Sequence, residues 1–193
     1  AGAIVKSGTL GLVRGFKGAF TFPLTREGDV RLESSLGGGS LWDVGCYPVS
    51  YTCFLAGKAP VEVFGWQQIN ASGIDLEFAG MMRFEDGAVA QFDSGFVGPF
   101  RAEMEAIGRD AALRIERPFR ADAMSALLLT TGDRTEALPF EPDEPFAGEI
   151  ADMEAAVLDS RPQRILLSES RRTVQTIRAL YDSARRGVPV SIP

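Results

Sequence analysis

Asp43 and Tyr47 are two side chains whose types and spacing suit proton-transfer chemistry, and they follow three consecutive glycines at 37–39. Ser40 stands where a helix N-cap would, and Asp43 three residues later predicts a variant of the capping box. A helix that begins near Leu41 would place Asp43 and Tyr47 on one face, close to its positively polarised N-terminus. The pattern therefore predicts a carboxylate and a phenol that share a small volume.

A purely structural interpretation of this pair also stands. An Asp at the third helical position is a common capping residue, and a Tyr on an amphipathic helix usually contributes to the core. The glycine run favours the functional interpretation, because glycines let a ligand or a second backbone approach where side chains would block it.

Composition limits the classes of protein to which the chain can belong. Its 193 residues suit a single domain, residues 1–193, with a core that needs no disulfide or metal. The net charge of −6 argues against a nucleic-acid partner or an anionic membrane surface. No apolar run approaches the length of a membrane span. We therefore expect a soluble, cytoplasmic protein.

The cysteines and the lack of histidine restrict the chemistry further. Cys46 and Cys53 lie seven residues apart on the expected helix, about 10 Å between α-carbons, which is too far for a disulfide. Because the chain has no histidine, Ser-His-Asp and Cys-His catalysis and most zinc sites are excluded, and we expect no metal. Proton transfer must use a carboxylate, a Tyr, a Lys or a group from outside this chain.

The remaining pattern predicts an α+β fold: a large, mostly antiparallel β-sheet with helices packed on one face. Period-two alternation and turn residues predict strands at 10–24, 61–66, 76–84, 88–94, 101–108, 111–116 and 123–130. Helical spacing predicts helices at 41–56, 147–159 and 168–186, and the apolar stripes of the last two are expected to be core. Pro48 predicts a kink or a wide first turn. Residues 1–7 indicate no element, and 25–36 and 139–145 indicate loops.

Several segments resemble, in order, the C-terminal half of the Gfo/Idh/MocA family, the relatives of glucose-fructose oxidoreductase and inositol dehydrogenase. The resemblance covers essentially the whole chain, and its most specific part is the glycine-rich segment that contains Asp43, Gly45 and Tyr47. The matching segments are residues 6–11, 29–31, 37–47, 168–170 and 181–187.

This resemblance implies a two-domain, NAD(P)-dependent dehydrogenase of sugars, polyols or dihydrodiols. In such proteins an N-terminal Rossmann domain binds the dinucleotide, and the C-terminal α+β domain supplies the substrate side and the oligomer contacts. By the same resemblance, Asp43 matches a substrate-orienting Asp and Tyr47 matches the acid/base. Arg31 is implied to approach the substrate. In having Tyr rather than His at position 47, the chain resembles the dihydrodiol, xylose and glucose-fructose branches of the family rather than the inositol dehydrogenases.

The chain departs from the family pattern in one respect. It has neither a Gly-x-Gly-x-x-Gly fingerprint nor a Glu-Lys-Pro segment. The resemblance therefore implies that the cofactor-binding residues, and the lysine that would lower the Tyr47 pKa, lie outside this sequence. A free Tyr has a pKa near 10, and Asp43 would raise it further. We expect the chain alone to be inactive and to bind NAD or NADP weakly or not at all.

Two hypotheses follow from the sequence. The first is the substrate-binding and oligomerisation domain of an NAD(P)-dependent oxidoreductase that acts on a sugar-like small molecule and forms a homo-oligomer through the sheet. The second is a non-catalytic oligomerisation or sugar-binding module derived from the same fold, for which the glycines and the helix start would be purely structural.

Overall fold

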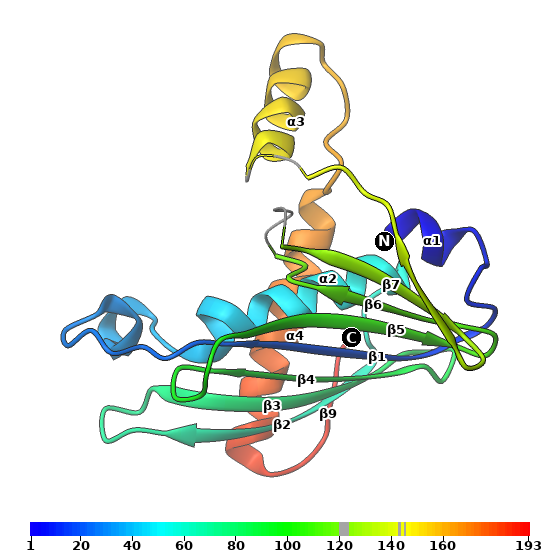
Figure 1. The fold of residues 1–193 in the computed structure, drawn as a ribbon. Helices are drawn as coiled ribbons and strands as arrows, with labels where there is room; N and C mark the ends of the chain where they lie inside the picture. Colours follow the sequence, from blue (N-terminus) through cyan, green and yellow to red (C-terminus); the bar gives the residue numbers. More distant parts are fainter. Residues whose placement is uncertain (120–123, 143, 145) are drawn as a thin grey trace.

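The computed structural model describes residues 1–119, 124–142, 144 and 146–193, and these form one open, mostly antiparallel sheet (Figure 1). The strand order is β8-β7-β6-β5-β1-β4-β3-β2-β9, and β1 and β4 form the parallel pair. The strands are β1 (Val13–Thr21), β2 (Glu62–Ile69), β3 (Asp75–Arg83), β4 (Val89–Gly95), β5 (Arg101–Gly108), β6 (Ala112–Glu116), β7 (Ala126–Thr131), β8 (Arg134–Leu138) and β9 (Val190–Ser191).

Of the four α-helices in the described part of the chain, two cover one face of this sheet and a third stands apart from it (Figure 1). The helices are α1 (Gly2–Lys6), α2 (Cys46–Ala56), α3 (Ala147–Leu158) and α4 (Leu167–Arg186). The covering helices are α2 and α4, and a π-helical turn, η3 (Leu41–Gly45), leads directly into α2. Two short 3-10 turns, η1 (Val30–Leu32) and η2 (Ser34–Leu36), precede it.

The core lies between the sheet and these two helices. Alternation along β3 buries Phe78 and Met82 against the helices, and α4 contributes Ile177 and Leu180. Gly65 on β2 allows α4 to come close, because a β-carbon there would lie 2.9 Å from the backbone oxygen of Leu180. The alternation along the strands and the apolar stripe of α4 thus point to the same interior. The site helix α2 packs into this interior through Val49 and Leu55.

The α+β prediction is confirmed, and so is the wide turn at the start of the second helix. Pro48 lacks the N–H that would bond to the carbonyl four residues earlier, which is consistent with a widened turn at that place. The prediction that residues 1–7 contain no element was wrong, since α1 forms there. The sequence also did not predict β8, β9 or the parallel pairing of β1 with β4.

Towards the C-terminal end, one prediction disagrees with the structure and others concern residues that the structure does not describe. The apolar stripe of the helix predicted at 147–159 was expected to be core, but in α3 it is exposed. Ala123, where the last predicted strand begins, and residues 143 and 145 of the predicted loop lie outside the described residues. Of the helices that the structure describes, none has the length and apolar character needed to span a bilayer.

Candidate functional site

A buried carboxylate, Asp75, fixes the backbone at the start of the site helix. Its Oδ2 accepts hydrogen bonds from the Ser40 hydroxyl at 2.9 Å and from the Leu41 backbone N–H at 2.8 Å. Its Oδ1 accepts a hydrogen bond from the Tyr181 hydroxyl at 2.8 Å. Only 3% of Asp75 is exposed. The first residue of β3 therefore links η3 to α4 through three hydrogen bonds.

This arrangement corrects the N-cap predicted for Ser40. Ser40 has helical dihedral angles and makes no side-chain capping bond to its own helix. Its hydroxyl donates to Asp75 instead, and Asp75 accepts the N–H of Leu41, which a local cap would otherwise serve. The cap is thus supplied by the side chain of Asp75 on β3, which lies 34 residues along the chain from Leu41.

The glycine run is required by this close approach. Gly39 has φ +128°, and a β-carbon there would overlap the Asp75 carboxylate. A β-carbon on Gly38 would overlap the backbone carbonyl of Arg31. The glycines therefore let two protein segments meet, which is one of the two uses that the sequence pattern allowed.

Burial decides the protonation behaviour of this cluster. Desolvation raises the pKa of Asp75, although the hydrogen bonds from Leu41, Tyr181 and Ser40 oppose that rise. Burial also raises the pKa of Tyr181, and the neighbouring Asp75 carboxylate adds to the effect. Tyr181 therefore remains a hydrogen-bond donor at neutral pH.

Arg31 and Asp43, both singled out in the sequence, lie together. The Arg31 Nε donates to Asp43 Oδ2 at 2.8 Å, and the Arg31 Nη1 donates to Asp29 Oδ1 at 3.2 Å. Asp29 also accepts the backbone N–H of Arg31 at 3.0 Å, and this bond is the largest cause of the lowered Asp29 pKa. The hydrogen bond to Asp43 raises the pKa of Arg31. The loop at 25–36 thus places a fixed cation beside Asp43.

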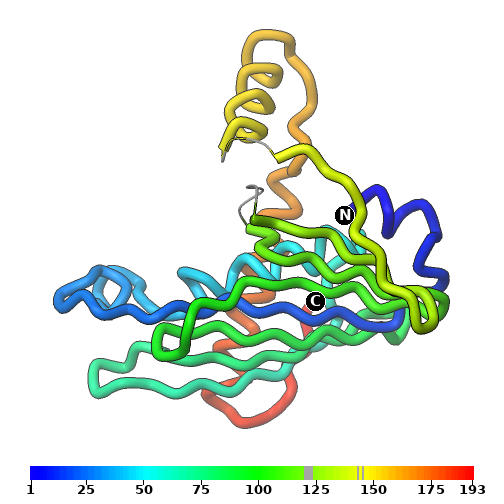
Figure 2. Tube along the Cα trace, in the orientation of Figure 1, coloured from blue at the N-terminus to red at the C-terminus, as the bar shows by residue number. Residues whose placement is uncertain are grey.

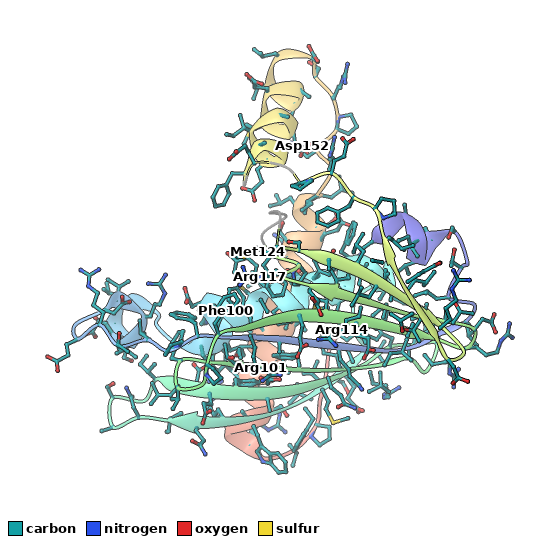
Figure 3. All side chains as sticks on the ribbon, viewed as in Figure 1. Phe100, Arg101, Arg114, Arg117, Met124 and Asp152 are labelled. Carbon is teal, nitrogen blue, oxygen red and sulfur yellow. The ribbon has the colours of Figure 1, made fainter. Side chains whose placement is uncertain are left out.

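Tyr47 lies in the first turn of α2, with its ring held by aromatic neighbours and 43% of its surface exposed. Its ring centroid is 5.4 Å from that of Phe20 on β1 and 5.2 Å from that of Phe119. Phe100 packs edge-on against Phe20, and the Arg117 guanidinium carbon lies 5.4 Å from the Phe100 ring centroid (Figure 3). These contacts restrict the ring of Tyr47 while part of its surface stays open to solvent.

The surroundings of Tyr47 keep its phenol protonated in this chain. Burial is the largest cause that raises its pKa, and the charges of Cys46, Asp43 and Glu149 raise it further. Asp43 accepts a hydrogen bond from Arg31, and within the described residues none joins it to the Tyr47 hydroxyl. A phenol in this environment can act as a base near pH 7 only when a cation from elsewhere lowers its pKa.

The two thiols and the acidic side chains do not form a metal centre within the described part of the chain. There, no group of three or more His, Cys, Asp or Glu side chains could hold a metal ion. Both cysteines are free thiols, as predicted. Burial raises the pKa of Cys46 to about 11 and that of Cys53 to about 12, so neither thiol is a ready nucleophile.

Sequence reasoning missed Asp75, Tyr181 and the aromatic wall of Phe20 and Phe119. Asp75 gave one usable signal, because Asp is depleted in strands and here begins one. Phe20 and Tyr181 gave none beyond an ordinary strand or helix pattern, and Phe119 lies outside the helices and strands.

Comparison with known families identifies the class of protein. The family model described as "GFO/IDH/MocA C-terminal domain" matches residues 1–114 of the chain. This match covers more than half of the chain, which therefore belongs to the GFO/IDH/MocA family, as the glycine-rich segment predicted.

Two curated relatives place the chain more closely. It is 30% identical over 186 residues to D-xylose 1-dehydrogenase (NADP(+)) 2 of Haloferax volcanii, covering 95% of this chain and 57% of the relative. It is 32% identical over 121 residues to dTDP-3,4-didehydro-2,6-dideoxy-alpha-D-glucose 3-reductase of Saccharopolyspora spinosa, covering 62% of this chain and 36% of that protein. The match thus spans 57% of the first relative and 36% of the second.

Solved structures share the fold. The aldose-aldose oxidoreductase of Caulobacter crescentus superposes with a TM-score of 0.91 at 22% identity, over 99% of this chain and 59% of that one. The 3-ketoreductase KijD10 of Actinomadura kijaniata, in complex with NADP and TDP-benzene, has a TM-score of 0.87 at 23% identity. The superposition covers 94% of this chain and 57% of the KijD10 chain.

The Asp75 cluster gives a prediction about stability. Asp75→Ala leaves the Ser40, Leu41 and Tyr181 donors without their buried acceptor, and we expect a loss of about 3 kcal/mol in the free energy of unfolding. Asp75→Asn should cost about half as much, because the amide oxygen can serve Ser40 and Leu41 while the amide N–H donates to the Tyr181 oxygen. Urea unfolding of the three proteins measures both values.

The control is Asp182→Ala, which removes an exposed carboxylate paired with Arg185 on α4 and should cost less than about 1 kcal/mol. An Asp75→Ala loss no larger than that of the control would contradict the account. The pH dependence has a defined sign. Because the Asp75 pKa is raised above 3.8, its contribution to stability is largest in acid and falls as pH rises above that value, and Asp75→Asn should remove this fall.

Proposed function

We propose that this chain is the substrate-side domain of an NAD(P)-dependent oxidoreductase that interconverts a hydroxyl and a carbonyl group on a sugar, polyol or dihydrodiol. The observation that carries the proposal is the Arg31–Asp43 ion pair at the helix start that also carries Tyr47, in a chain of the GFO/IDH/MocA family. The curated relatives named above, which act on sugars according to their names, support the substrate class.

In this proposal the three side chains have different roles. Tyr47 moves the proton of the reacting hydroxyl, because its ring is held while part of it remains open to a ligand. Asp43 accepts a hydrogen bond from the substrate and orients it, and Arg31 holds Asp43 through its Nε. Arg31 also offers its partly exposed guanidinium to a substrate oxygen.

The cofactor belongs to a second domain in this proposal. A nucleotide-binding domain, outside residues 1–193, holds NAD or NADP and carries the lysine that lowers the Tyr47 pKa. When bound, the nicotinamide supplies or accepts the hydride. Support comes from length, since the chain covers 57% of its Haloferax volcanii relative, and from the raised Tyr47 pKa, which leaves the phenol protonated near neutral pH.

The alternative is a non-catalytic module derived from the same fold, for assembly or sugar binding. Reading the coding sequence upstream of Ala1 discriminates between the two. A strand followed by Gly-x-Gly-x-x-Gly and, further on, Glu-Lys-Pro favours the enzyme. A stop codon or an unrelated domain favours the module.

Replacing Tyr47 tests the catalytic role in the protein that carries both domains. Tyr47→Phe keeps the ring between Phe20 and Phe119 but removes the proton-transfer group, so kcat should fall by about 10²- to 10⁴-fold. Initial rates are measured with NADP and a panel of aldoses that begins with D-xylose. Tyr51→Phe, one turn further along α2, is the matched control and should keep kcat within about twofold. Equal rates for Tyr47→Phe and the control would remove the role assigned to the phenol.

We also propose that the protein is a homo-oligomer through the open face of the sheet. That face carries Phe64, Trp66 and Met81 from β2 and β3 beside ion pairs such as Arg101–Asp93, and Trp66 is 68% exposed. Arg101 and Arg114 project from the strands of this sheet in Figure 3. An apolar patch with a charged surround suits a self-complementary contact.

Substituting Trp66 tests this assembly. Trp66→Asp places a charge at the centre of the proposed contact, and we expect the dimer dissociation constant to rise at least about 100-fold. Sedimentation velocity over a concentration series measures it. Leu12→Asp, an exposed apolar position outside this face, is the control and should leave the constant unchanged. A protein that remains monomeric before substitution would contradict the proposal.

A further inference from the structure

α3 presents an apolar face that the described residues do not cover. The helix stands clear of the sheet and of α2 and α4 (Figures 1 and 2), and none of its twelve residues, all described, is buried. Ile150, Met153 and Val157 recur at helical spacing and are 62%, 64% and 68% exposed. These three residues, called the α3 patch below, line a shallow hollow together with Glu149, Glu154 and Leu158.

The stability of such a short helix depends on a surface that covers its apolar face. An isolated helix of about 12 residues is only marginally stable in water, and helices in proteins depend on packing of their apolar side. The opposite side of α3 is already occupied, since Asp152 accepts the backbone N–H of Arg164 at 3.1 Å, and Figure 3 labels Asp152 on this helix. A contiguous exposed apolar face beside an occupied one marks an interaction site.

The position of α3 selects among partners. In Figure 1, α3 stands beyond β7 with its first turn toward the rest of the domain, and Glu149 in that turn interacts electrostatically with the Tyr47 phenol. Whatever delivers nicotinamide to Tyr47 must cover that same side. In the assembly proposed above, a second copy of the chain would occupy a different surface, the open sheet face on which Trp66 lies.

Length supplies a further argument. The Caulobacter crescentus structure superposes on 99% of this chain, α3 included, but only 59% of that structure is covered. A structure of this fold therefore has a large further part outside the region that it shares with this chain.

We propose that the α3 patch is the docking surface for the nucleotide-binding domain of the same polypeptide, and that α3 holds this domain over Tyr47. The inference rests on the proposed function, because it assumes that such a domain exists. Glu149 and Glu154 flank the patch, so the docked surface should have an apolar centre with Lys or Arg at its edge.

Hydrogen exchange in the protein that carries both domains tests the docking. The amides of residues 150–158 should be protected in the parent protein. In the double variant Ile150→Asp and Val157→Asp they should exchange at least about tenfold faster. Ala151→Asp is the matched control, because Ala151 is exposed on α3 away from the patch, and its exchange should stay within about twofold of the parent.

The outcomes separate this inference from the proposed function. NADP affinity of the parent protein is measured in parallel by titration. Tight NADP binding with equal exchange in the double variant and the control overturns the docking and leaves the proposed function standing. Protection that increases with protein concentration assigns the patch to a second copy and overturns the docking as well. A parent that binds neither NADP nor NAD, titrated in the same way, overturns both.

Discussion

The buried carboxylate of Asp75 is the interaction on which the rest of the candidate site depends. It joins three parts of the fold, β3, the turn that precedes α2, and α4, through hydrogen bonds from Ser40, Leu41 and Tyr181. Burial removes this carboxylate from water, which raises its pKa, and the hydrogen bonds from its donors offset part of that cost. The cluster is therefore stable only while these donors stay in place. The widened turn that follows carries Asp43, and Tyr47 comes directly after it. The positions of both therefore derive from a contact that neither residue makes.

Electrostatics makes the site incomplete as it stands. Arg31 neutralises Asp43, whereas burial and neighbouring acidic groups raise the pKa of Tyr47. A proton-transfer role for this phenol requires a cation that the described residues do not place beside it. The packing of α3 leaves a similar gap, because neither the sheet nor its two covering helices bury the apolar side chains of that helix.

Much of the fold and part of the site could be predicted from the sequence, because the signals were local. Period-two alternation located most strands, and the glycine run with Asp43 and Tyr47 located the helix start. Asp75 could not be paired with Ser40, because the two lie 35 residues apart and hydrogen bonds of this kind leave no periodic pattern. Arg31 was named from resemblance alone, and its bond to Asp43 depends on the path of the loop. The stripe of α3 looked like core because helical spacing does not reveal what covers a face.

The central claim is that this chain is one wall of a site whose cofactor wall lies on another domain. Isothermal titration of NADP and of NAD into residues 1–193 and into the protein with its nucleotide-binding domain tests it most directly. The account predicts dissociation constants above about 1 mM for the chain alone and at least about 100-fold tighter binding for the longer protein. Submillimolar binding to residues 1–193 alone would contradict it.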